Sequence, residues 1–123
     1  MESIFYQQNY NNKLDCPVHT TIRLYNPSKF AVGKEFNEYL ICKKDTPDSF
    51  MLDGKNVIKV ATVKCIEVKV YQLKDITSSM AWIDTGKGLA YLKSLLEHIY
   101  ARELKTNPNP HFHWVLLKNI NHQ

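Results

Sequence analysis

A short polar run near the start of the chain, His19-Thr20-Thr21-Ile22-Arg23, gathers the side chains most suited to binding an anion. The run has the β-branched, alternating pattern of a strand, and Asn26-Pro27 ends it with turn residues. Side chains two apart in a strand share a face, so His19, Thr21 and Arg23 would present an imidazole, a hydroxyl and a guanidinium together. Spacing alone leaves two interpretations open: a donor-rich surface for an anion, or an edge strand whose polar face meets water.

The charge of the chain is compatible with an anionic partner without requiring one. Lys and Arg number 16 against 12 Asp and Glu, a net charge of +4, and the lysines are scattered among acidic residues. Arg23 and Arg102 are the two arginines in the sequence, so they are the two candidates for bidentate recognition of a phosphate. Lys29 and Lys34 follow Arg23 closely and would add non-specific attraction.

Signals for other chemistry are weak. The sequence contains no dinucleotide-binding glycine motif, Walker loop, zinc-protease motif or serine-hydrolase motif. His111 and His113 have a spacing that can chelate a metal, but nothing in the sequence supplies a third ligand, so we predict no metal site and no cofactor. Cys16, Cys42 and Cys65 form no C-x-x-C pair, which predicts free thiols in a reducing compartment.

Length and composition favour one ordinary domain. The chain has 123 residues, of which 44% are hydrophobic, with 4 glycines and 5 prolines. Its first residues lack the cationic and apolar regions of a signal peptide, and no apolar run approaches the ~20 residues of a membrane span. We therefore predict a cytoplasmic protein with no membrane partner.

The elements that must position these side chains are mostly strands. Alternation predicts strands over 20–25 and 36–42, a long strand over 57–71 and a closing strand over 111–117. The alternation in the long strand slips by one residue near Cys65 and Ile66, which predicts a bulge or a sharp bend. Residues 43–54 have the composition of a loop or hairpin tip.

Two helices are expected between the long strand and the closing strand. A short helix is predicted over 77–82, and a long one over 88–105, where Leu89, Leu92, Leu96 and Ile99 form one apolar stripe. Asp84 or Thr85 would cap the long helix. The element order predicts an α+β fold, a small curved sheet or β-barrel flanked by one long and one short helix. Residues 1–15 are expected to form a partly mobile lead, in which the polar run 7–13 carries no core residues, 16–118 the domain, and 119–123 a C-terminal tail.

Several segments, taken in order, resemble a known family. They are Thr21-Ile22-Arg23, residues 30–36, residues 70–76, Ala81 with Asp84, Ile99-Tyr100 and Trp114-Val115-Leu116. This ordered set, spread over residues 16–118, is similar to the ASCH domain, a family of small PUA-like β-barrels. The resemblance implies a cytoplasmic domain related to RNA-binding PUA modules, with a cleft between the barrel and the helices.

The same resemblance implies candidate catalytic residues. Some ASCH members are amidohydrolases on acylated cytidine, and others are linked to RNA cleavage. In the hydrolases a lysine lies three residues before the motif threonine, and an acidic residue precedes the main helix. By position the motif threonine is Thr21, the acidic residue is Asp84, and the lysine is replaced by Val18, which can neither attack nor transfer a proton. His19 could act as a base instead.

Three functions are therefore compatible with the sequence. The first is a non-catalytic RNA- or nucleotide-binding module using His19, Thr21, Arg23, Lys29 and Lys34, in which Tyr25, Tyr39 or Trp82 would stack a base. The alternative is a small amidohydrolase or ribonuclease using His19, Thr21 and Asp84. The third is a protein-interaction domain of a phage or mobile element, which would use an exposed sheet edge.

Overall fold

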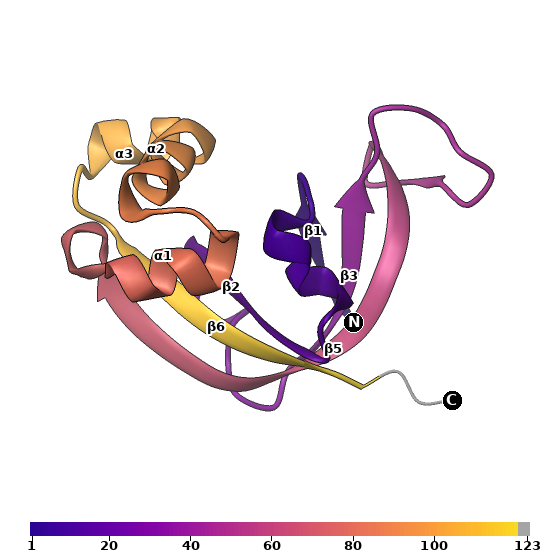
Figure 1. Cartoon of the computed structure of the whole chain (residues 1–123), viewed down its shortest axis with the longest axis horizontal. Coiled ribbons are helices and arrows are strands. Elements are labelled where there is room, and N and C mark those ends of the chain that lie inside the picture. Colours follow the sequence, from indigo (N-terminus) through magenta and orange to yellow (C-terminus); the bar gives the residue numbers. More distant parts are fainter. Residues whose placement is uncertain (121–123) are drawn as a thin grey trace.

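A computed structural model describes residues 1–120, apart from the side chain of Asn11, and shows an α+β fold built on one mixed sheet (Figure 1). Within these residues the six strands are β1 (Glu2–Tyr6), β2 (Val18–Leu24), β3 (Glu35–Ile41), β4 (Phe50–Leu52), β5 (Lys55–Gln72) and β6 (His111–Asn119). The strand order is β1-β3-β5-β6-β2, with β4 paired to the start of β5. β1 runs parallel to β3, and every other pair is antiparallel.

β5 connects the two halves of the sheet. Its first half pairs with β3 and β4, and its second half pairs with β6. The register of β5 against β6 shifts between Cys65 and Glu67, which confirms the predicted bulge. A bulge bends its strand and increases the local twist. As a result, the two ends of the sheet stand on opposite sides of the molecule in Figure 1 and face each other.

The sheet curls but does not close into a barrel. Within residues 1–120 its edge strands, β1 and β2, form no backbone ladder with each other. Side chains join them instead: Nη2 of Arg23 on β2 donates to the carbonyl oxygen of Phe5 on β1 at 2.8 Å. Nε2 of His19, also on β2, lies 2.7 Å from Oε2 of Glu38 on β3. The expected curved sheet is therefore present, and it stays open, with side chains linking its two edge regions.

Three helices follow β5 in the described part of the chain: α1 (Ser78–Thr85), α2 (Leu89–Ile99) and α3 (Ala101–Thr106). A single turn of 3-10 helix, η2 (Leu73–Asp75), leads into them. They cover one end of the sheet through a buried cluster that includes Ile22, Leu92, Leu96 and Phe112. None of the helices in residues 1–120 has the length and apolar character that a bilayer span needs.

The prediction of a single long helix over 88–105 is wrong, because the helix is interrupted at Tyr100. This residue leaves helical geometry, with φ −108° and ψ 29°, and its hydroxyl accepts a hydrogen bond from the backbone N–H of Leu24. The predicted cap is also wrong. Asp84 and Thr85 lie in the last turn of α1, Gly86 ends that helix in the left-handed conformation, and Gly88 precedes α2.

The N-terminal residues add a strand to the sheet and contribute to its core on both sides of the polar run 7–13. They form β1 and a 3-10 helix, η1 (Tyr10–Asp15), and Ile4, Tyr6 and Leu14 are only 1%, 3% and 4% exposed. The short alternation of Ile4 and Tyr6 is easily missed beside the polar run that follows it. Of the expected C-terminal tail, Asn119 belongs to β6, and residues 121–123 lie outside the described part.

Candidate functional site

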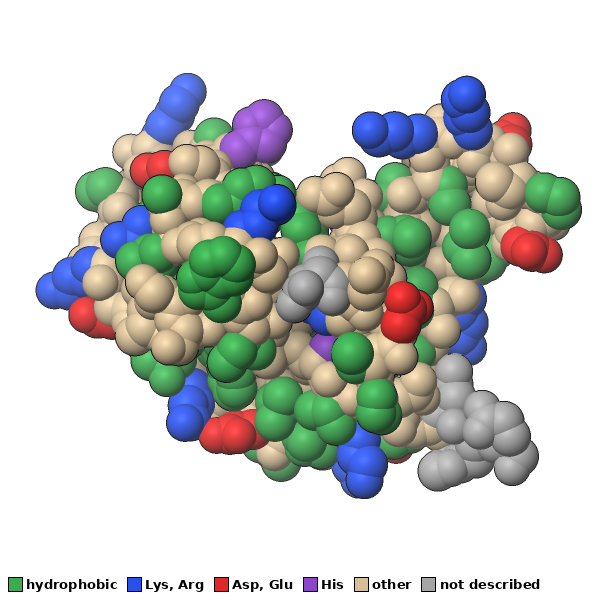
Figure 2. Space-filling view, viewed as in Figure 1, with side chains coloured by type: hydrophobic (Ala, Val, Ile, Leu, Met, Phe, Trp, Pro, Cys, Tyr) green, Lys and Arg blue, Asp and Glu red, His purple; other side chains and the backbone are tan. Residues whose placement is uncertain are grey.

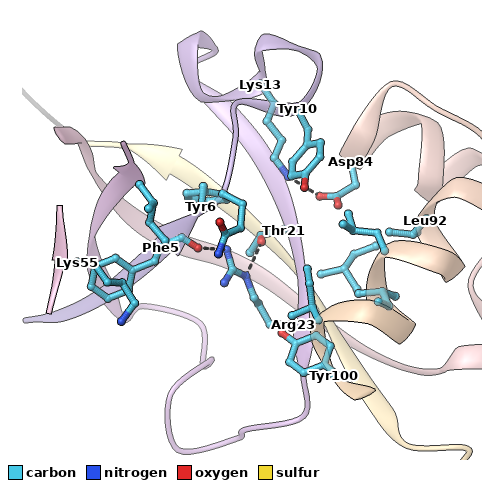
Figure 3. A pocket seen from close by; sticks show the side chains of 16 residues that line it. Phe5, Tyr6, Tyr10, Lys13, Thr21, Arg23, Lys55, Asp84, Leu92 and Tyr100 are labelled. Carbon is cyan, nitrogen blue, oxygen red and sulfur yellow. Dashed lines mark hydrogen bonds and ion pairs between the residues drawn. The ribbon is translucent and has the colours of Figure 1, made fainter. Parts of the chain in front are cut away.

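A cavity of about 220 Å³ opens between the N-terminal segment and the helices (Figure 3). The space-filling view shows the surface notched between the helical side and the end that carries the β4–β5 hairpin (Figure 2). The side chains of α2 form an apolar wall, to which Leu92, Leu95 and Leu96 contribute. Aromatic, charged and hydroxyl side chains line much of the rest, namely Phe5, Tyr6, Tyr10, Lys13, Thr21, Arg23, Lys55, Asp84 and Tyr100.

Lys13 and Asp84 form a buried ion pair at one end of this cavity. Nζ of Lys13, on η1, donates to Oδ1 of Asp84, on α1, at 2.7 Å. The hydroxyl of Thr20 donates to the same oxygen at 3.0 Å. Burial lowers the pKa of Lys13, and the negative charge of Asp84 partly opposes this change. The chain thus places an amine, a carboxylate and a hydroxyl together, although they come from three separate segments.

The structure distinguishes the two threonines. Thr20 contacts Asp84, whereas Thr21 lines the cavity and its hydroxyl accepts a hydrogen bond from Nε of Arg23 at 2.9 Å. Thr21 and Asp84, the two residues assigned by the family resemblance, both line the cavity, but it is Thr20 that contacts the carboxylate. Adjacent residues of a strand point to opposite faces, so only one of the two neighbouring hydroxyls, that of Thr20, reaches the carboxylate.

Arg23 is held at the centre of the cavity, as Figure 3 shows. Its guanidinium donates to Thr21 and to the Phe5 carbonyl, and it lies 5.0 Å from the centre of the Tyr6 ring. An arginine carries five N–H donors, and two of them bond to groups that the structure describes, which leaves three. A guanidinium fixed in this way needs little reordering to bind an anion.

His19 lies in a buried network behind the cavity and does not line it. Its Nε2 lies 2.7 Å from Oε2 of Glu38, and the hydroxyl of Tyr6 donates to the same oxygen at 2.6 Å. The other oxygen of Glu38 has no partner among the described residues. Burial, followed by the charge of Glu38, raises the pKa of Tyr6 well above its ordinary value. The structure therefore separates His19 from Thr21 and Arg23, with which it was grouped.

Lys29 and Lys34 lie outside the cavity lining. Lys34 forms an exposed ion pair with Glu2 at 3.0 Å. Lys29 is partly buried, and its pKa is lowered first by burial and then by the charge of Arg23. Lys55 is the surface lysine that does line the cavity, with Nζ 4.7 Å from the centre of the Phe5 ring.

Lys13 and Lys55 are the functional candidates that the sequence did not reveal. Lys13 sits in a polar run with the composition of a loop, and it meets Asp84 only because β1 adds to the sheet beside β3. Lys55 looks like any lysine at a hairpin turn. The short alternation in β1 was the one local signal that could have predicted an ordered N-terminal segment.

The described residues offer no ready metal centre. No three His, Cys, Asp or Glu side chains in residues 1–120 cluster as metal ligands would. His111 and His113 do not form a pair of ligands on an open face, because His113 is buried and stacks on Tyr25.

No family model, curated protein or solved structure matches this chain. The resemblance to the ASCH family therefore stays a prediction from the order of its sequence motifs.

Proposed function

We propose that this protein is a cytoplasmic, PUA-like module that binds RNA or a nucleotide in the cavity around Arg23. The observation that carries the proposal is the anchored guanidinium of Arg23, with three N–H donors that none of the groups described by the structure engages. Charge-assisted hydrogen bonds from such a group suit a phosphate.

The rest of the cavity fits the other parts of a nucleotide. Tyr10 and Tyr100 supply aromatic surface, and the leucines of α2 supply an apolar wall for a base. Lys55 lies at the opposite side of the cavity from the helices and adds positive charge. Arg23 binds the anion, and Lys29, which lies outside the cavity lining, adds positive charge to the attraction.

The test is binding of short single- and double-stranded RNA and DNA, and of nucleoside monophosphates, at low and moderate salt. The affinity should fall as salt rises. Arg23→Gln should weaken binding about tenfold or more, because it removes charge-assisted hydrogen bonds. Arg102→Gln makes the same charge change on the exposed face of α3 and is the matched control. Equal losses in the two variants would contradict the proposed site.

Arg23 also joins the edge strands, so Arg23→Gln could lose binding because it folds poorly. A second pair of variants, which leaves this link intact, tests the site independently. Lys55→Gln removes a cation from the cavity lining, and Lys59→Gln removes an exposed cation further along the same strand, outside the lining. We expect Lys55→Gln to weaken binding severalfold and Lys59→Gln to have little effect.

The Lys13–Asp84 pair supports a second candidate, hydrolysis of an acylated cytidine. Asp84 could accept a proton from an attacking water, and the ammonium of Lys13 could stabilise the negative charge that develops on the carbonyl oxygen. Thr20 does not line the cavity, so it would act by holding Asp84 in place. This arrangement supplies a lysine that the sequence motif lacks at Val18.

The hydrolase candidate is tested with an N4-acylated cytidine. If it is correct, Asp84→Asn should lower the rate at least 100-fold, and Thr20→Val should lower it less. Thr21→Val, which leaves the Lys13–Asp84 pair intact, is the comparison. Hydrolysis that survives Asp84→Asn would exclude this assignment.

A further inference from the structure

A second cavity, of about 310 Å³, lies beside the first. It is formed by the end of β2, the C-terminal part of α3 and the start of β6, and it includes Leu24, Tyr25 and His111. The two cavities share a wall. Tyr100 lines the first cavity, and its hydroxyl accepts a hydrogen bond from the backbone N–H of Leu24, which lines the second. The linings of the two cavities are therefore in direct contact.

Tyr25 forms a rigid aromatic surface in this second cavity. Its side chain is half exposed, and its ring stacks on His113 with 4.8 Å between centroids and 17° between planes. His113 is 2% exposed, and neither of its ring nitrogens has a partner within residues 1–120. Phe30 packs against the same imidazole at 5.6 Å. His113 thus acts as a packing surface that fixes the Tyr25 ring, and the exposed half of that ring can receive another ring.

The spacing between Arg23 and Tyr25 fits successive parts of one nucleic-acid strand. The β2–β6 ladder continues past Leu24, because the backbone N–H of Tyr25 donates to the carbonyl of His111 at 3.0 Å. Residues two apart in an extended strand are about 6.6 Å apart and share a face. A phosphate on Arg23 therefore places the next base within reach of Tyr25.

The polar residues of the second cavity favour a base over a phosphate. Glu103 contributes a carboxylate, which repels a phosphate and accepts hydrogen bonds. Asn107 also lines the cavity, and its Oδ1 accepts a hydrogen bond from the backbone N–H of Asn109. Its amide NH₂ is thereby left to donate to a ring nitrogen or carbonyl. Bases with an exocyclic amine match this pair of groups.

We propose that the second cavity holds the neighbouring base of a single-stranded RNA, stacked on Tyr25, while Arg23 holds the phosphate between the two bases. This inference rests on the proposed function and extends it from a single nucleotide to at least two. It also distinguishes single strands from duplexes, since a base in a duplex is stacked on its neighbours and cannot stack on a protein ring.

The test compares the affinities of adenosine monophosphate and of an adenine dinucleotide of RNA, on the full chain. The dinucleotide should bind about 5- to 100-fold more tightly, the range expected for one stacked base. Tyr25→Leu should remove most of this gain and leave the affinity for adenosine monophosphate within about twofold, whereas Tyr91→Leu, on α2 and outside both cavities, should remove none of it.

The outcomes separate the two proposals. A monophosphate that binds as tightly as the dinucleotide would overturn the second base site and leave the first intact. A gain that survives Tyr25→Leu would overturn it as well. If neither ligand binds, both proposals fail. Glu103→Ala, at an exposed position, is the second variant if Tyr25→Leu folds poorly, and it should reduce the dinucleotide gain alone.

Discussion

The guanidinium of Arg23 on β2 donates a 2.8 Å hydrogen bond to the carbonyl oxygen of Phe5 on β1, the opposite edge strand of the same sheet. The group that we propose for anion binding is therefore also a group that holds the curled sheet together. A ligand anion on the remaining N–H donors would hold the guanidinium in its position without competing for the Phe5 carbonyl. Anion binding and the hydrogen bond between the two edge strands are thus expected to stabilise each other.

Glu38 is expected to be essential for stability. Glu38→Leu would leave His19 and Tyr6 buried without their shared acceptor, so the free energy of unfolding should fall by about 3 kcal/mol. Urea denaturation measures this loss. Glu67→Leu is the control, because Glu67 pairs with Lys69 on the exposed surface, where a pair contributes at most about 1 kcal/mol. Losses of equal size would contradict the role given to Glu38.

Lys13 and Asp84 should be energetically coupled. Lys13→Met leaves the Asp84 carboxylate buried with Thr20 as its remaining partner, and Asp84→Leu leaves a buried amine. Each single variant should lose about 3 kcal/mol of stability. The double variant should lose less than the sum of the two, by about 1 to 3 kcal/mol. A double-mutant cycle from denaturant unfolding gives the coupling, and additive losses would mean that the pair contributes nothing as a pair.

His113 should make the protein less stable in mild acid. Burial lowers the pKa of His113, so the unfolded chain binds a proton near pH 6.5 while the folded protein stays neutral to lower pH. Stability therefore falls as pH drops through the interval between the ordinary pKa and the lowered one, by at most about 1.4 kcal/mol per pH unit.

His113→Phe should reduce this acid-dependent loss while keeping the stacking with Tyr25. Unfolding free energies at pH 7 and pH 5 test the point, with His111→Phe, at an exposed position, as the comparison. At pH 7 the variant should be at least as stable as the parent, because it removes two buried nitrogens that lack partners within the described residues. Parallel pH profiles for the parent and His113→Phe would refute the prediction.

The three thiols should react with an alkylating reagent in the order of their exposure. Cys16 is exposed, Cys42 is partly buried, and Cys65 is fully buried with its pKa raised by burial. Thiolates are the reactive form, so Cys65 should stay unmodified until the protein unfolds. Mass spectrometry of the native protein over time measures the order. Labelling of Cys65 as fast as Cys16 would contradict the core placement of this residue.

Local periodicity was enough to predict most strands and the bend in the sheet. The phase change near Cys65 and Ile66 is visible in the sequence because a bulge reverses the alternation of buried and exposed residues. The apolar stripe of Leu92 and Leu96 likewise predicts the buried face of α2. The break at Tyr100 was not predictable in this way, because it depends on a contact with β2 that is distant in sequence.

The candidate site was predicted only in part, for the same reason. Arg23, Thr21 and Asp84 do line one cavity, as grouped from the sequence. His19 lies instead in a buried network outside the cavity lining. A strand pattern does not show which polar side chains find partners inside the protein. Lys13 was missed because it meets Asp84 across 71 positions of sequence.

The bulge in β5 also determines how the cavity can change width. Phe5 and Lys55 belong to the part of the sheet that joins the first half of β5, whereas Arg23 and the helices join the second half through β6. The two walls of the cavity are therefore attached to the two halves of one bent strand, β5. Opening of the cavity would therefore require a change of backbone torsion around Cys65–Glu67 and the loss of the Arg23–Phe5 hydrogen bond between the two walls.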